Sequence, residues 1–114
     1  MTDTGPDQAT RLADLDHAQA VQAAALLRAL ANPTRLMVLC SLVEGEHSVS
    51  ELNARIPLSQ SALSQHLARL REEALVATRR ESRTIHYRIA DPMVVKLITP
   101  LHRRFCRPPD APSA

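Results

Sequence analysis

Residues 48–70 read SVSELNARIPLSQSALSQHLARL, and this stretch decides the fold. It opens with Ser48-Val-Ser-Glu51, the S-x-x-E form of a capping box, which predicts a short helix running through Arg55. Residues 56–58 break that helix, and Ser59 can cap a second one. The second helix carries an apolar inner face formed by Leu63, Leu67 and Leu70. Two short helices joined by a tight turn predict a helix-turn-helix.

Two further helices are expected before this stretch. Residues 12–30 are rich in alanine, the best helix former, and predict a long first helix. Asn32 and Pro33 suit the cap and the first position of a second helix, and Gly45 is a plausible end signal for it. The apolar stripe of this second helix is formed by Leu36, Leu39, Cys40 and Val43.

After the helix-turn-helix the pattern changes from helix to strand. Residues 75–79 and 84–89 predict two strands joined by a short hairpin loop. A final helix is expected from Met93 to Cys106, and Pro100 should kink or split it because the proline ring clashes with the preceding turn. The predicted fold class is mainly α with a small β-hairpin. The order is four helices, two strands and one helix, which defines a winged helix-turn-helix.

The two ends of the chain differ in composition from this region. We expect residues 1–11 to be a flexible N-terminal segment, residues 12–106 to form the winged helix-turn-helix domain, and residues 107–114, with three prolines, to be a disordered tail. No apolar run approaches the roughly 18 residues of a membrane helix, and the N-terminus lacks a signal-peptide pattern. We therefore expect a cytoplasmic protein without membrane contact, in which a disulfide would be regulatory.

Positive charge is concentrated in one part of the chain. The net charge is only +2, yet residues 55–88 carry seven arginines against three glutamates, which leaves +4 on that stretch. A local basic patch suits a polyanionic partner. Aromatic residues make up only 2% of the chain, which argues against single-stranded nucleic acid, whose bases stack on aromatic side chains. Double-stranded DNA is the expected partner.

Short polar side chains near the start of the second helix of the helix-turn-helix can read base edges in the major groove. Arginines of the hairpin can lie along the phosphate backbone or in the minor groove. The alternative is that the polar residues only solvate an amphipathic helix, but the preceding short helix and the following basic hairpin favour DNA. The residues expected to bind DNA are Gln60, Ser61, Ser64 and Gln65 at the bases, His66 and Arg69 at phosphates, and Arg80 and Arg83 in the hairpin.

Four segments carry a more specific pattern: Leu30-Ala-Asn-Pro-Thr-Arg-Leu36, Ser48-Val-Ser-Glu-Leu52, Leu58-Ser-Gln-Ser-Ala-Leu-Ser-Gln-His-Leu67 and Thr78-Arg-Arg-Glu-Ser-Arg-Thr-Ile-His-Tyr87. They resemble the ArsR/SmtB family of bacterial repressors, over roughly residues 20–106. The resemblance implies a homodimer joined by the first and last helices, which binds operator DNA and releases it when an inducer acts.

Two residues depart from the family pattern. Ser82 lies where many winged hairpins carry glycine, so either it takes a positive φ at a small cost or the turn differs. Pro100 interrupts the helix that the family uses for dimerisation.

The metal sites of this family are incomplete here. One family site uses cysteines at the start of the third helix, where residues 48–55 contain none. Another uses acidic and histidine ligands on the last helix, where only Asp91 and His102 are present. We therefore expect no metal and no cofactor. A metal sensor stays open as an alternative, because two thiols and a histidine can hold zinc if they converge. The chain also lacks a Cys-x-x-Cys motif and a nucleophile–base arrangement, so no enzyme activity is expected.

The two cysteines indicate an inducer other than a metal ion. Cys40 lies on an apolar stripe, and Cys106 ends the last helix beside Arg103, Arg104 and Arg107. Each cysteine alone can be an ordinary packing or incidental residue. Together they resemble the persulfide-sensing BigR/SqrR branch of the family, to which HlyU is related.

That resemblance implies that reactive sulfur species, or in some relatives oxidants, link the two thiols within a subunit. The link is a disulfide or a longer bridge such as a tetrasulfide, and it releases operator DNA so that sulfide-detoxification genes are transcribed. A switch that responds to oxidants alone is a further alternative. Because flanking arginines favour a thiolate, we expect Cys106 to be attacked before Cys40.

Overall fold

The computed structural model of the chain describes residues 11–106, which fall into two compact units with their boundary between Ala31 and Asn32. The predicted flexible segment 1–11, apart from Arg11, and the predicted tail 107–114 lie outside the described residues.

The first unit contains a short 3-10 turn, η1 (Leu12–Asp14), and one helix, α2 (His17–Leu30). The expectation that this helix begins at Leu12 is wrong. The Asp16 side chain accepts a hydrogen bond from the Gln19 N–H at 2.8 Å, and the Asp16 N–H donates to the Gln19 side chain at 3.0 Å. This capping box gives partners to backbone donors at the helix start, and so it fixes the start at His17.

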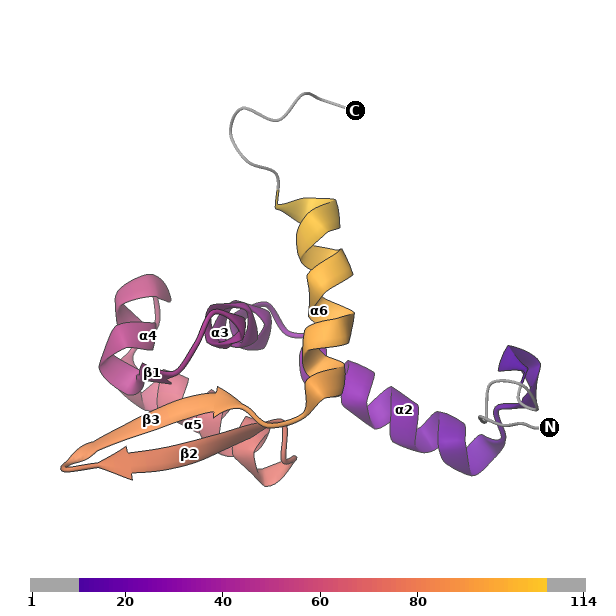
Figure 1. Cartoon of the computed structure of the whole chain (residues 1–114), viewed down its shortest axis with the longest axis horizontal. Helices are drawn as coiled ribbons and strands as arrows, with labels where there is room; N and C mark the ends of the chain where they lie inside the picture. Colours follow the sequence, from indigo (N-terminus) through magenta and orange to yellow (C-terminus); the bar gives the residue numbers. More distant parts are fainter. Residues whose placement is uncertain (1–10, 107–114) are drawn as a thin grey trace. The chain divides into compact units, whose positions relative to one another are not determined.

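Three of the four helices of the second unit begin where their caps predict, and the last begins at Pro92, one residue before the expected Met93. The four helices are α3 (Pro33–Val43), α4 (Val49–Arg55), α5 (Gln60–Glu72) and α6 (Pro92–Phe105), as Figure 1 shows. In each helix a capping side chain accepts a hydrogen bond from a backbone N–H of the first turn, and the caps are Asn32, Ser48, Ser59 and Asp91. With the hairpin described next, this order confirms the predicted winged helix-turn-helix.

A small antiparallel sheet follows the helix-turn-helix in the chain. Strands β2 (Val76–Glu81) and β3 (Thr84–Ile89) pair along their whole length, and β3 lies in the centre of the sheet. The other neighbour of β3 is β1 (His47–Ser48), which the sequence did not predict because two residues show no alternation. The tip of the β2–β3 hairpin, which forms the wing, lies at the far end of this unit from α6 (Figure 1).

The loop of the hairpin consists of two residues only, because Glu81 pairs with Thr84. Ser82, the first loop residue, has a φ of 59°. Of the two alternatives for Ser82, the structure therefore shows the positive φ. Two-residue loops need positive φ values because these match the right-handed twist of the strands.

The core of the second unit lies between its helices and the sheet. The helix α3 contacts α5, α6 and β3, and the predicted inner face of α5 is fully buried. Burying a leucine or valine side chain stabilises the fold by about 1.5–3 kcal/mol. The buried apolar side chains of this unit are Val38, Leu39, Leu42, Leu52, Ile56, Leu63, Leu67, Leu70, Leu75, Val76, Val94 and Ile98.

Pro100 lies inside α6 without interrupting it. The helix runs from Pro92 to Phe105 as one element, so the predicted split is wrong. Proline lacks the N–H that would bond the carbonyl one turn earlier. Beside this gap the Thr99 hydroxyl donates to the Val95 carbonyl at 2.7 Å. The last helix therefore carries Cys106, its C-cap residue, on a continuous support.

No single helix among residues 11–106 is both long and apolar enough to span a membrane.

Ala74 ends α5 in a backbone conformation that alanine seldom adopts. Its φ is 60°. The Ala74 N–H donates to the Arg71 carbonyl at 2.9 Å, and the Leu75 N–H donates to the Leu70 carbonyl at 3.0 Å. Glycine is the usual residue at this position of a helix end, because it has no Cβ to clash in the left-handed region.

We expect Ala74→Gly to raise the free energy of unfolding by about 1 kcal/mol, because it removes the left-handed strain. Urea denaturation of the full chain measures this value. The matched control is Ala68→Gly on the exposed side of the same helix, which should lower the stability by about the same amount. A loss of stability in both variants would contradict the strain at Ala74.

Candidate functional site

The turn between α4 and α5 is held by one amide side chain. Asn53 donates from Nδ2 to the carbonyl of Leu58 at 2.7 Å and to the carbonyl of Ile56 at 3.3 Å. The Ile56 side chain is buried beneath this turn. These contacts fix the direction in which α5 leaves the turn, and a recognition helix needs such a fixed direction to enter a groove.

The outer face of α5 presents the residues that the sequence predicts for base contacts. Gln60, Ser61, Ser64 and Gln65 are all exposed. Among the described residues, Gln60, Ser64 and Gln65 have no hydrogen-bond partner for their side chains, whereas Ser61 lies 3.4 Å from the capping Ser59 hydroxyl. Exposed amides and hydroxyls of this kind can donate to and accept from base edges.

The two predicted phosphate contacts of α5 are placed differently. His66 is half-buried, and Arg69 is exposed but lies 3.6 Å from the Glu73 carboxylate. An exposed ion pair of this kind contributes little to stability, so Arg69 can exchange Glu73 for a phosphate at small cost.

In the hairpin, Arg80 and Arg83 are exposed near the tip. Arg80 donates from Nε to the Ser82 carbonyl at 3.2 Å, which leaves its remaining N–H groups for another partner. Arg79 is different, because it donates to the Glu46 carboxylate at 2.7 and 3.0 Å. This hydrogen bond lowers the pKa of Glu46 and raises the pKa of Arg79. No local sequence signal indicates this pair, because its members lie on segments far apart in the chain.

Both cysteines line one groove between α3 and α6. Cys40 is half-buried on α3 and Cys106 is exposed at the end of α6, and both are free thiols. The groove has a volume of about 490 Å³. Its other lining residues are mostly apolar, and they include Leu36, Met37, Leu101 and Phe105, together with His102.

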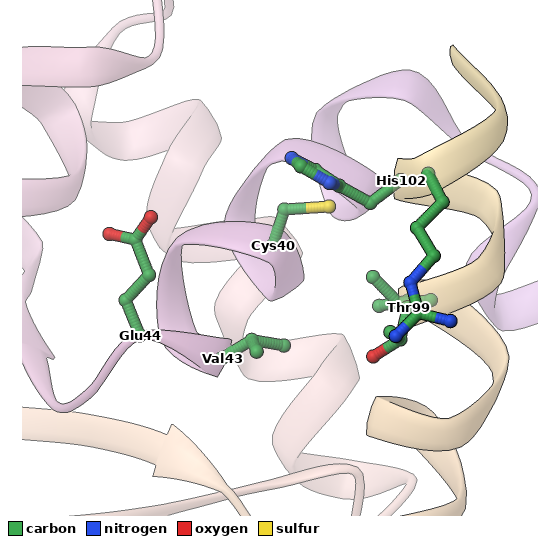
Figure 2. Close-up of a pocket in the computed structure, with 7 residues that line it drawn as sticks. Cys40, Val43, Glu44, Thr99 and His102 are labelled. Atoms are coloured by element: carbon green, nitrogen blue, oxygen red, sulfur yellow. The ribbon is translucent and has the colours of Figure 1, made fainter. Parts of the chain in front are cut away.

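A smaller hollow of about 240 Å³ also contains Cys40 and His102. Figure 2 shows the sulfur of Cys40 directed toward α6, with the His102 side chain reaching over from α6. Burial raises the pKa of the Cys40 thiol, and the negative charges of Cys106 and Glu44 raise it further.

Metal ligands do not gather in this region. Within residues 11–106, no group of three or more histidine, cysteine or acidic side chains has a geometry that could hold a metal ion. Cys40, His102 and Cys106 thus share a groove without forming a coordination site in this conformation.

The helix-turn-helix, its exposed polar face and the basic hairpin together define a DNA-binding regulator of the winged helix class. The pattern of the "Bacterial regulatory protein, arsR family" matches residues 32–78. The chain is 50% identical over 86 residues to the "Transcriptional activator HlyU" of Vibrio cholerae, covering 75% of this chain and 80% of that protein. It is 47% identical over 90 residues to the "Biofilm growth-associated repressor" of Agrobacterium fabrum, covering 79% and 77% of the two chains.

The fold agrees with these relatives. A solved structure of reduced HlyU from Vibrio cholerae N16961 matches this chain with a TM-score of 0.75 at 48% identity, covering 79% of this chain and 95% of that one. The chain belongs to the ArsR family of bacterial regulatory proteins, in the branch of HlyU and the biofilm growth-associated repressor. These relatives regulate transcription and are not enzymes.

Proposed function

We propose that this regulator is a repressor that releases operator DNA when reactive sulfur species or an oxidant link Cys40 to Cys106. The shared groove carries the proposal, because it brings together two thiols that lie 66 positions apart in the chain, at 40 and 106. The link would form within one subunit, as a disulfide or through additional sulfur atoms. It would tie the end of α6 to α3.

The two thiols differ in accessibility, which supports an order of reaction. Cys106 is exposed at the end of α6, whereas Cys40 is half-buried and its pKa is raised. A thiolate is the nucleophile in such chemistry, so the more buried thiol reacts more slowly with a reagent from solution. Cys106 would therefore react with the inducer first, and Cys40 would close the link. Arg107, the third arginine expected to assist Cys106, lies outside the described residues.

A link at this place can reach the DNA-binding helix through packing. The helix α3 carries Cys40 and contacts both α6 and α5. A linked form that favours a different arrangement of these helices by about 1–3 kcal/mol would lower DNA affinity roughly 5- to 150-fold. Repression also fits the name of the Agrobacterium relative, although HlyU is named an activator.

Two copies of the chain would bind double-stranded operator DNA. In each copy the face of α5 with Gln60, Ser61, Ser64 and Gln65 would meet bases, while His66, Arg69, Arg80 and Arg83 would meet phosphates.

Dimerisation through α2 and α6 is supported by large apolar side chains exposed on each helix: Val21 and Leu27 are each 55% exposed, Leu101 44% and Phe105 72%. A monomer exposes such side chains at a cost that a partner helix would remove.

Intact mass and operator binding, measured on the same samples, test the proposal. The reduced full chain first selects an operator duplex from a random library, and is then treated with polysulfide, peroxide or zinc. We expect a loss of two protons for a disulfide, or a gain of sulfur for a longer bridge, together with weaker operator binding. Unchanged affinity after both polysulfide and peroxide would overturn the sulfur switch. Release by zinc alone would instead support the metal-sensing alternative, and release by peroxide alone the oxidant-only switch.

A further inference from the structure

The imidazole of His102 lies in the groove with both thiols. We propose that His102 accepts the proton of Cys40 when the link between the two cysteines closes. This inference rests on the proposed function, because it assigns a base to the second step of that reaction.

The position of His102 supports this role in two ways. The residue lines both hollows that contain Cys40, and Figure 2 shows its side chain reaching from α6 toward the Cys40 sulfur. Its backbone carbonyl also accepts the Cys106 N–H at 2.7 Å. His102 and Cys106 therefore lie one helical turn apart, and both line the groove that contains Cys40.

Cys40 needs a base because it starts the second step as a thiol. Burial, and to a smaller extent the charge of Glu44, raise the pKa of Cys40 whether or not Cys106 has been modified, and only the thiolate attacks sulfur efficiently. A general base within reach of such a thiol takes the proton as the new bond forms.

Other groups around the hollow are poorer bases. The charged and titratable side chains that line these hollows with His102 are Cys40 on α3, Glu44 directly after α3, Arg55 at the end of α4, Arg103 on α6 and Cys106 directly after α6. The Glu44 carboxylate lies 3.4 Å from the Arg55 guanidinium, so it is already paired with a cation. Guanidinium groups do not accept protons, and a general base works best when its own titration lies near the working pH. Histidine is the side chain that ordinarily titrates there.

The closing step balances in atoms and electrons. Let Cys106 carry an activated sulfur, Cys106–S–X, in which X is SH after a reactive sulfur species or OH after an oxidant. The Cys40 sulfur bonds to the Cys106 sulfur, the S–X bond breaks, and X leaves with the electron pair of that bond. The proton passes from the Cys40 sulfur to a ring nitrogen of His102 and then to X. The sum is Cys40–SH + Cys106–S–X → Cys40–S–S–Cys106 + HX, in which the inducer has been the oxidant.

The test follows the two steps separately in the full chain. Polysulfide, and peroxide in a second series, are added to reduced protein, and samples are alkylated at intervals and weighed by mass spectrometry. We expect His102→Gln to slow closure of the link by about 100-fold or more at neutral pH. The first step, measured as modification of Cys106 in the Cys40→Ser background, should change less than about twofold when His102→Gln is added.

The pH profile separates a base from a merely structural residue. In the wild-type chain, closure should speed up as pH rises through about 5 to 8, where an imidazole becomes able to accept a proton. In His102→Gln it should speed up only at alkaline pH, where Cys40 ionises by itself, and so the two rates should converge there. Arg103→Lys is the matched control, because it changes the next lining residue but keeps the positive charge near Cys106 and removes no base.

Equal closure rates in wild type and His102→Gln, or equal slowing by Arg103→Lys, would overturn the role of His102. If the wild-type chain never forms the link, the proposed function itself fails, and this inference fails with it. Operator binding by the reduced variants shows that each is folded.

Discussion

Replacing Cys106 with serine should leave operator binding by the reduced protein unchanged and abolish the loss of binding after polysulfide. The reason is that Cys106 is exposed at the C-cap of α6 and packs into no core, so its removal costs little stability. Without this thiol, the groove contains no second thiol for Cys40. Wild type should lose roughly 5- to 150-fold in affinity on treatment, and Cys106→Ser about none. Fluorescence anisotropy with the selected operator duplex measures both values.

Cys40→Ser is the informative companion to this variant. Its Cys106 should still gain mass from the inducer, because the first thiol is intact, but no link can close. Operator binding should therefore persist despite modification. DNA release by singly modified Cys40→Ser would show that an adduct on Cys106 is sufficient, and it would contradict a switch that depends on joining α3 to α6.

The second large effect is expected at Gln65. This amide is exposed on α5, and glutamine can bond two atoms of an adenine edge in the major groove. We expect Gln65→Ala to weaken binding to the selected operator by about 5- to 150-fold, since a good base contact contributes about 1–3 kcal/mol of discrimination. Binding to a scrambled duplex should change little. Competition between the two duplexes measures the ratio directly.

Arg83→Ala provides the contrast for that measurement. Arg83 is exposed in the hairpin loop and is expected to meet a phosphate, which carries no sequence information. Its removal should weaken operator and scrambled duplex by similar factors. If Gln65→Ala behaves in the same way, α5 does not read bases through this residue.

Local signals in the sequence predicted most of the fold, because helix starts depend on the few residues around each cap. Asn32, Ser48, Ser59 and Asp91 each make the capping bond that their residue type favours. The same kind of signal was missed at Asp16, whose capping box overrides the helix-forming alanines and leucines before it. At Pro100 the local signal was given too much weight. The proline predicted a split, but α6 tolerates the one backbone hydrogen bond that proline cannot make.

Features that depend on distant segments were beyond local prediction. The strand β1 exists only because β3 pairs with His47 and Ser48, and the ion pair of Glu46 with Arg79 joins residues far apart in the chain. The sequence alone left Cys40 and Cys106 as separate residues, and only the family resemblance linked them. The groove supplies the physical reason, because it is formed by two helices that the fold brings together.

The ion pair between Glu46 and Arg79 has a consequence for the response of the protein to salt. DNA releases condensed counterions only for phosphates that a protein cation newly neutralises. Arg79 is already neutralised by Glu46 at 2.7 Å, so this arginine brings no free charge to the duplex. The hairpin therefore displaces fewer ions than its arginine content suggests. The affinity of the hairpin for DNA should consequently fall less steeply as the ionic strength of the cell rises.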